Sequence, residues 1–123
     1  MTRLTGTRAV LTISLLLSLA AAATRTRLLA DDAPRTIAVT ARRFEFEPKQ
    51  ITLHKGETVR LSVTSQDVQH GFFSRPLKID ADLAPGQETQ VLLTPQETGT
   101  YTIICDHFCG AQHGNMKLTV TVE

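Results

Sequence analysis

The chain has 123 residues, of which 41% are hydrophobic and 20% are charged, and its formal net charge is +1. This composition excludes a disordered tail and a polytopic membrane protein, and the near-neutral charge excludes the basic surface that nucleic-acid binding requires. With an N-terminal export segment set aside, about 100 residues remain, which suits one small domain with a single hydrophobic core.

The N-terminus has the features of a secretory signal. Arg3 and Arg8 precede an uncharged stretch over residues 9–23 that ends in four alanines, which is the order of regions in a signal peptide. As a helix this stretch would reach roughly 22 Å, short of the about 30 Å of bilayer hydrocarbon. We therefore expect residues 1–23 to be a signal peptide or a marginal membrane anchor. The domain would be exported to the periplasm or to the outer face of the cytoplasmic membrane.

The rest of the chain has the pattern of a small all-β domain. Residues 24–34 are polar and lack periodicity, which predicts a flexible leader. Over residues 35–123, short hydrophobic runs, several of them alternating with polar residues, are separated by turn residues at intervals of roughly 8–12 residues. The runs typical of strands lie at residues 37–39, 51–53, 59–63, 91–93, 100–104 and 118–122. We predict a β-sandwich of seven to eight strands with no helix longer than one turn.

The residues with metal-binding chemistry gather in two segments. DVQHGFF spans residues 67–73 and contains His70, and CDHFCGAQHGNM spans residues 105–116. The second segment lies in the predicted loop between two strands, where binding residues of rigid sandwiches usually sit. Thiolate and thioether ligands combined with imidazole favour copper among the first-row metals.

Four of these side chains form the ligand set of a mononuclear blue-copper site. His70 and His113 supply two imidazoles, Cys109 a thiolate and Met116 an axial thioether. Cys105 is an additional thiolate, and at four positions from Cys109 it can bridge to a second copper. Sharing one electron between two metals in a rigid loop requires little reorganisation, which favours rapid electron transfer.

The two segments together resemble a known family. CDHFCGAQHGNM is similar to the CuA-binding motif Cys-x3-Cys-x3-His-x2-Met of cytochrome c oxidase subunit II, and DVQHGFF is similar to that family's upstream histidine segment. The framework sequences around them match the cupredoxin framework in the same order. The chain resembles this CuA-binding cupredoxin domain, and in particular the short subunit II of B-type heme–copper oxidases, over roughly residues 43–123. The resemblance implies a cupredoxin-like Greek-key β-sandwich over residues 35–123.

The resemblance also implies a mixed-valence CuA centre of two copper ions. Its metal-binding residues here would be His70, Cys105, His107, Cys109, His113 and Met116. Both cysteines would bridge the ions, His70 and Met116 would complete one copper, and His113 and the main-chain carbonyl of His107 would complete the other. The family usually carries glutamate or glutamine at residue 107, but every residue offers a carbonyl. Asp67 and Asn115 are expected to support the metal histidines through hydrogen bonds.

The function implied by the resemblance is single-electron transfer. The domain would pass electrons between a cytochrome c-type or other redox protein donor and a terminal oxidase or similar reductase, with heme–copper oxidase subunit I as a further partner. No nucleic acid is expected, and membrane association is expected only through residues 1–23. No catalysis is expected from this chain alone, and no catalytic residue is assigned.

Three alternatives are open from the residues. In an exported protein the two cysteines could form a disulfide, although that would leave His70, His113 and Met116 without a role. Zinc accepts two cysteines and two histidines, but it would not use Met116. An exported protein for copper delivery or storage would need a labile and usually methionine-rich site, and this chain has one candidate methionine.

Overall fold

A computed structural model describes residues 33–123. The predicted signal peptide or anchor over residues 1–23, and nearly all of the predicted leader over residues 24–34, lie outside the described residues. No helix within the described part is long and apolar enough to cross a membrane. Residues 34–123 form one unit that contains both metal-binding segments.

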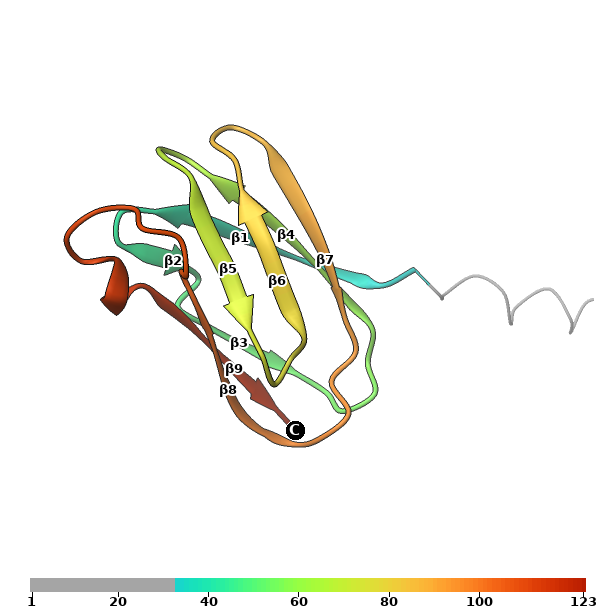
Figure 1. Ribbon diagram of the computed structural model, residues 1–123. Helices are drawn as coiled ribbons and strands as arrows, with labels where there is room; N and C mark the ends of the chain where they lie inside the picture. The colour runs from blue at the N-terminus through green and yellow to red at the C-terminus, as the bar shows by residue number, and fades with distance from the viewer. Residues whose placement is uncertain (1–32) are drawn as a thin grey trace, which may run out of the picture. The chain divides into compact units, whose positions relative to one another are not determined.

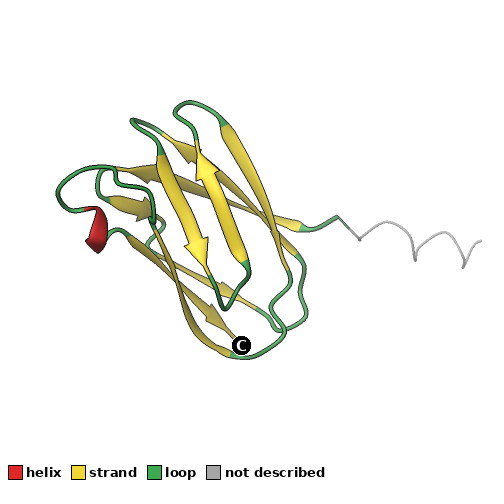
Figure 2. Ribbon diagram, in the orientation of Figure 1, coloured by secondary structure: helices red, strands yellow, loops and turns green. Residues whose placement is uncertain are grey.

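Nine strands and one short 3₁₀ turn make up this unit (Figures 1 and 2). In chain order they are β1 (Arg35–Arg42), β2 (Glu45–Glu47), β3 (Gln50–Leu53), β4 (Val59–Ser65), β5 (His70–Ser74), β6 (Ile79–Leu83), β7 (Glu88–Leu93), β8 (Gly99–Ile104), η1 (His113–Asn115) and β9 (Lys117–Val122). One sheet has the strand order β2-β1-β4-β7 and the other the order β3-β9-β8-β5-β6. The pairs β1–β4 and β3–β9 are parallel, and the other pairs are antiparallel. The predicted all-β sandwich is confirmed, with nine strands in place of seven to eight.

Alternating hydrophobic residues build the core between the two sheets. In β4, Val59, Leu61 and Val63 are fully buried, and the residues between them are partly exposed. Burying such a side chain contributes about 1.5–3 kcal/mol. Phe46 on β2 and Phe72 on β5 meet edge-to-face across the core, with ring centroids 5.4 Å apart. This contact joins the two sheets through the strand that begins with His70.

Three strands are not revealed by alternation: β2, β5 and β6. In β6 only the two end residues, Ile79 and Leu83, are buried. β2 has only three residues, which is too short for a visible period. β5 is buried at four of its five positions, so polar residues do not alternate along it. Strands buried on both faces lose the alternating pattern. The reason for this burial is the loop after β8, which covers the outer face of β5 at Gly71.

Three connections meet at one end of the sandwich. They are the β1–β2 turn at residues 43–44, the β4–β5 loop at residues 66–69 and the long β8–β9 loop that ends in η1 (Figure 1). Hydrogen bonds from Arg43 to Asp67 and to Cys109 join all three. Both metal-binding segments therefore lie at this end of the fold.

Candidate metal centre

Three of the expected ligands form a buried cluster. The ligand atoms of His70, Cys105 and Cys109 all lie within 4.8 Å of one another. The Cys105 Sγ is 3.8 Å from the Cys109 Sγ and 3.8 Å from the His70 Nδ1. All three side chains are at most 4% exposed. Residues that are 35 positions apart in the sequence thus converge on one dry site.

Paired strands set the positions of His70 and Cys105. His70 is the first residue of β5, and Cys105 directly follows β8, which pairs with β5 through Phe73 and Ile104. The Cys105 N–H donates to the Met116 carbonyl at 3.2 Å, which closes the base of the β8–β9 loop. Paired strands therefore hold both ends of the loop that carries the ligands.

Gly71 allows the ligand loop to lie directly against β5. A Cβ at this position would lie 1.9 Å from the Asp106 Oδ1, and 2.8 and 2.9 Å from the main-chain nitrogens of His107 and Asp106. Main-chain atoms this close leave no room for any side chain. The Gly71 N–H also donates to the Cys105 Sγ at 3.4 Å.

Asp67 determines which nitrogen of His70 faces the sulfurs. Its Oδ1 lies 2.7 Å from the His70 Nε2, so the Nδ1 is left to face Cys105. A carboxylate in this position orients a metal-binding imidazole and increases its basicity. Partial burial alone would raise the pKa of Asp67, but hydrogen bonds from the Arg43 N–H, the His70 ring and the Val68 N–H outweigh it and lower the pKa to about 2. The group is therefore a carboxylate at neutral pH.

The two thiols are buried next to each other. Burial raises the pKa of the Cys109 thiol to about 11, and the neighbouring Cys105 adds to the rise through a hydrogen bond and its charge. The Cys105 thiol donates to the main-chain carbonyl of His107 at 3.1 Å. A soft metal cation replaces these protons and offsets the cost of two adjacent buried thiolates. The donor set thus fits copper, and the cluster is consistent with a copper site.

The two remaining expected side-chain ligands, Met116 and His113, come from the segment just before β9. Met116 is 1% exposed and directly precedes β9. His113 lies on η1, outside the group of three mutually close ligands. Its Nδ1 is buried and has no hydrogen-bond partner among the described residues. A buried imidazole nitrogen without a partner is costly.

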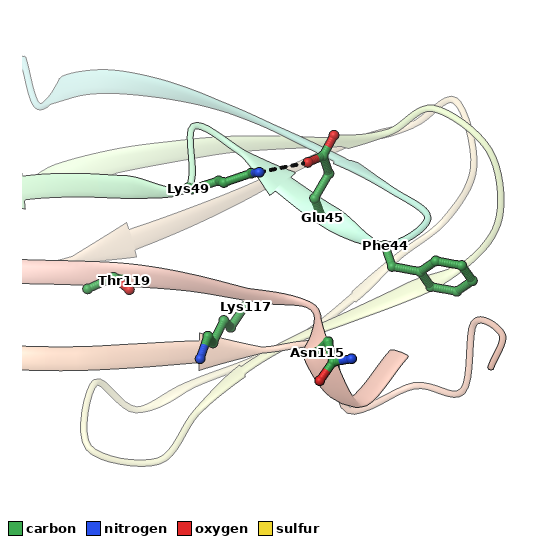
Figure 3. Close-up of a pocket in the computed structure, with 6 residues that line it drawn as sticks. All are labelled: Phe44, Glu45, Lys49, Asn115, Lys117 and Thr119. Atoms are coloured by element: carbon green, nitrogen blue, oxygen red, sulfur yellow. Dashed lines mark ion pairs between the residues drawn. The ribbon is translucent and has the colours of Figure 1, made fainter. Parts of the chain in front are cut away.

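The His107 side chain is exposed, and only its carbonyl faces the cluster. Phe108, the next residue, is 72% exposed and meets the His113 ring edge-on, with centroids 5.3 Å apart. Asn115 was expected to support a metal histidine, but its side chain lines a surface hollow with Phe44 and Lys117 (Figure 3). Of the two residues expected to support the metal histidines, Asp67 hydrogen-bonds to one of them. No such bond is present for the Asn115 side chain among the described residues.

The cysteines are free thiols in this structure. Their sulfur atoms are 3.8 Å apart, whereas a disulfide requires about 2.05 Å. The two cysteines therefore do not form a disulfide in this structure. The loop brings the two thiols together while leaving both available to a metal.

Arg43 is a contact of the site that the sequence did not indicate. Its Nε donates to the Cys109 carbonyl at 2.8 Å, and its main-chain N–H donates to the Asp67 Oδ2 at 2.7 Å. The only visible signal is a basic residue between the end of one hydrophobic run and Phe44. That signal cannot be separated from an ordinary surface arginine.

A β-sandwich with a buried imidazole and two thiols at one end defines the chain as a small metal-binding domain. The Cupredoxin-like domain family matches residues 8–120, so the chain belongs to the cupredoxin family. The family resemblance inferred from the sequence is confirmed.

Curated relatives are similar over part of this chain. The chain is 35% identical over 88 residues to cytochrome c oxidase subunit 2 of Thermus thermophilus, which covers 72% of this chain and 65% of that protein. It is 39% identical over 70 residues to a probable cytochrome c oxidase subunit 2 of Streptomyces avermitilis, which covers 57% of this chain and 22% of that protein. The chain thus spans less than two thirds of the length of these relatives.

Solved structures share the fold. The periplasmic domain of subunit II of cytochrome oxidase from Bradyrhizobium japonicum has a TM-score of 0.68 at 20% identity, covering 74% of this chain and 85% of that one. Auracyanin A, a blue copper protein from Chloroflexus aurantiacus, has a TM-score of 0.61 at 17% identity, covering 74% of this chain and 100% of that one. Since one fold serves both proteins, the fold alone does not decide between their kinds of site.

Proposed function

We propose that this domain carries a binuclear CuA centre and passes single electrons between a cytochrome c-type or other redox donor and a terminal heme–copper oxidase. The observation that carries the proposal is the position of Cys105. A mononuclear site of this fold class needs one thiolate, yet the Sγ atoms of Cys105 and Cys109 lie 3.8 Å apart in one buried cluster. A second thiolate at this distance is suited to bridging two metal ions.

The proposed ligand assignment is the one that the resemblance to the CuA-binding family implies. Both cysteines would bridge the two ions, and the His70 Nδ1 and the Met116 thioether would complete one copper. The His113 Nδ1 and the His107 carbonyl would complete the other. Two features support this second half: the carbonyl accepts a bond from the Cys105 thiol at 3.1 Å, and the His113 Nδ1 is buried without another partner among residues 33–123.

The residues around the cluster suit electron transfer. When bound, the centre supplies a one-electron couple shared between two metals. The chain contributes ligands held by paired strands, so the donor atoms move little between oxidation states. Burial of both sulfurs excludes water, and the exposed Phe108 next to Cys109 gives a partner protein an apolar contact beside the ligands. Heme–copper oxidase subunit I is the proposed receiving partner.

The proposed location is the periplasm or the outer face of the cytoplasmic membrane. Residues 1–23 would act as a signal peptide or a marginal anchor, residues 24–34 as a leader, and residues 35–123 as the cupredoxin domain. The basic residues, apolar run and alanines of the N-terminal sequence support this organisation. N-terminal sequencing of the exported protein tests it, because cleavage after Ala23 would leave Thr24 as the first residue.

Reconstitution with copper tests the function. The domain spanning residues 34–123 is loaded with Cu(II) and a reductant, and copper per chain is measured together with the paramagnetic spectrum. We expect two coppers and one unpaired electron shared by two copper nuclei. One copper per chain, with splitting from a single nucleus, would contradict the proposal. Rapid loss of copper to a chelator would instead support delivery or storage, and tight binding of zinc with no stable copper form would support a zinc site.

A further inference from the structure

Arg43 contacts both segments that carry the proposed ligands. Its guanidinium Nε donates to the Cys109 carbonyl at 2.8 Å, and its main-chain N–H donates to the Asp67 carboxylate at 2.7 Å. The same carboxylate holds the His70 ring at 2.7 Å. A single residue of the β1–β2 turn thus connects the thiolate side of the cluster to its imidazole side.

The contact belongs to a closely packed interface. A Cβ on Gly110 would lie 2.8 and 2.9 Å from the Phe44 ring and 3.7 Å from the Arg43 Nε. The loop after Cys109 therefore lies directly on residues 43–44. Gly110 also has a φ of +141°, which favours glycine. Because the backbone is confined on this side, the arginine meets the carbonyl in a defined geometry.

We propose that Arg43 is a positioning residue that holds the Cys109 segment in place and, through its fixed positive charge, raises the reduction potential of the metal centre. The inference rests on the proposed function, because a potential requires the bound copper. Reduction adds one negative charge to the cluster, and a cation against the Cys109 carbonyl stabilises the reduced form more than the oxidised form. An arginine keeps its charge at every accessible pH, so this contribution is constant.

The proposal also predicts a dependence on salt. Arg43 is an exposed residue, so ions in solution screen its charge. The Debye length falls from about 30 Å at 0.01 M to about 3 Å at 1 M ionic strength. The electrostatic part of the effect must therefore shrink as salt is added, whereas a purely structural effect would not.

Arg42 provides a matched control. It is exposed, adjacent in the sequence, and has the same charge. Its guanidinium is directed to the Glu45 carboxylate, with an Nη2–Oε1 distance of 2.5 Å, and it makes no hydrogen bond to the ligand loop among the described residues. Arg42→Gln removes the same formal charge as Arg43→Gln without touching the Cys109 carbonyl.

The experiment compares the copper-loaded wild-type domain with Arg43→Gln, Arg43→Lys and Arg42→Gln at low and high ionic strength. At low salt we expect Arg43→Gln to favour the oxidised form by about tenfold, which is about 59 mV for a one-electron couple. Arg43→Lys should lie between it and the wild type, because it keeps the charge but loses the planar donor. Arg42→Gln should stay near the wild type, and the Arg43→Gln difference should shrink at high salt.

Equal potentials for Arg43→Gln and Arg42→Gln, or a difference that salt leaves unchanged, would overturn the tuning role. Amide hydrogen exchange of the metal-free proteins tests positioning separately. Exchange over residues 107–110 should rise in Arg43→Gln and not in Arg42→Gln, and equal exchange would overturn that role. If the wild type forms no copper centre, the proposed function fails, while the exchange measurement still decides whether Arg43 holds the loop. If Arg43→Gln alone fails to load copper, that result supports the positioning role. The tuning role is then tested with Arg43→Lys, whose reduction potential should lie below that of the wild type.

Discussion

The two ends of the sandwich are closed by different chemistry. At the end opposite the site, main-chain groups and exposed ion pairs join the loops: the Lys55 N–H donates to the Glu123 carbonyl at 2.8 Å, and the Arg35 Nε lies 2.8 Å from the Glu57 Oε1. At the site end, the groups that meet are two buried thiols and the buried imidazole of His70. One of the ring nitrogens there, the His113 Nδ1, has no partner among the described residues.

This difference shows which end depends on a ligand. Exposed groups at the opposite end keep water as an alternative partner, so each of their contacts contributes little. Buried polar groups have no such alternative, and a buried ring nitrogen without a partner, such as the His113 Nδ1, costs stability. The site end thus gives up some stability in favour of binding. Substitutions there should change stability and copper binding more than substitutions at the opposite end.

Gly71→Ala should have the largest effect. The new Cβ would fall within 2.9 Å of two main-chain nitrogens of the ligand loop, so the loop must move away from β5. We expect loss of the copper site and a decrease of about 1–3 kcal/mol in the free energy of unfolding of the metal-free domain. Gly114→Ala is the control, because nothing lies within 4 Å of its Cβ. Copper stoichiometry and thermal unfolding measure both effects, and a Gly71→Ala domain with wild-type copper binding would contradict the close packing.

Cys105→Ser should change the kind of site. It removes one thiolate and leaves the four residues of a mononuclear set, His70, Cys109, His113 and Met116. We expect one copper per chain and loss of the mixed-valence spectrum, with the fold retained because serine is similar in size. Two tightly bound coppers in this variant, measured by metal analysis, would show that Cys105 does not bridge.

The two histidines of the ligand loop should respond differently to substitution. His107→Ala keeps the carbonyl and removes only an exposed side chain, so both coppers should remain with nearly the same absorption spectrum. His113→Ala removes an imidazole whose Nδ1 is buried without a partner among the described residues, and it should lose or disturb one copper. Absorption and paramagnetic spectra of the two variants measure this. The opposite outcome, an empty site in His107→Ala and an intact one in His113→Ala, would mean that the assignment of the loop is wrong.

The parts of the fold that could be predicted are those with a local signal. The alternation of Val59, Leu61 and Val63 predicted β4, because one face of that strand packs on the core. β5 had no such signal, since the ligand loop buries its second face. The spacing of Cys105 and Cys109 predicted a pair of nearby thiols, and the structure places their sulfurs 3.8 Å apart.

The contact of Arg43 could not be predicted, for a physical reason. Its partner is a main-chain carbonyl 66 residues away, and a carbonyl has no signature in the sequence because every residue has one. The requirement for Gly71 is of the same kind, since it depends on where the backbone of residues 106–107 lies. Side-chain chemistry indicates which residues bind, whereas the contacts that place them depend on the folded backbone.

The smallest expected effect lies at the opposite end, where pH tests the ion pair between Glu57 and Arg35. The hydrogen bond and charge of Arg35 lower the pKa of Glu57 below its ordinary value of 4.5. A carboxyl whose pKa is lowered by folding stabilises the native state at pH values above its pKa in the unfolded chain. This stabilisation is lost as the pH falls through its pKa in the folded protein.

Glu57→Gln should therefore lower the melting temperature slightly at pH 7, by a few degrees at most because the pair is exposed. The difference from the wild type should vanish in acid, below the folded pKa. At each pH, the copper stoichiometry and reduction potential of Glu57→Gln should equal those of the wild type. A difference in either would show that the two ends of the domain are coupled.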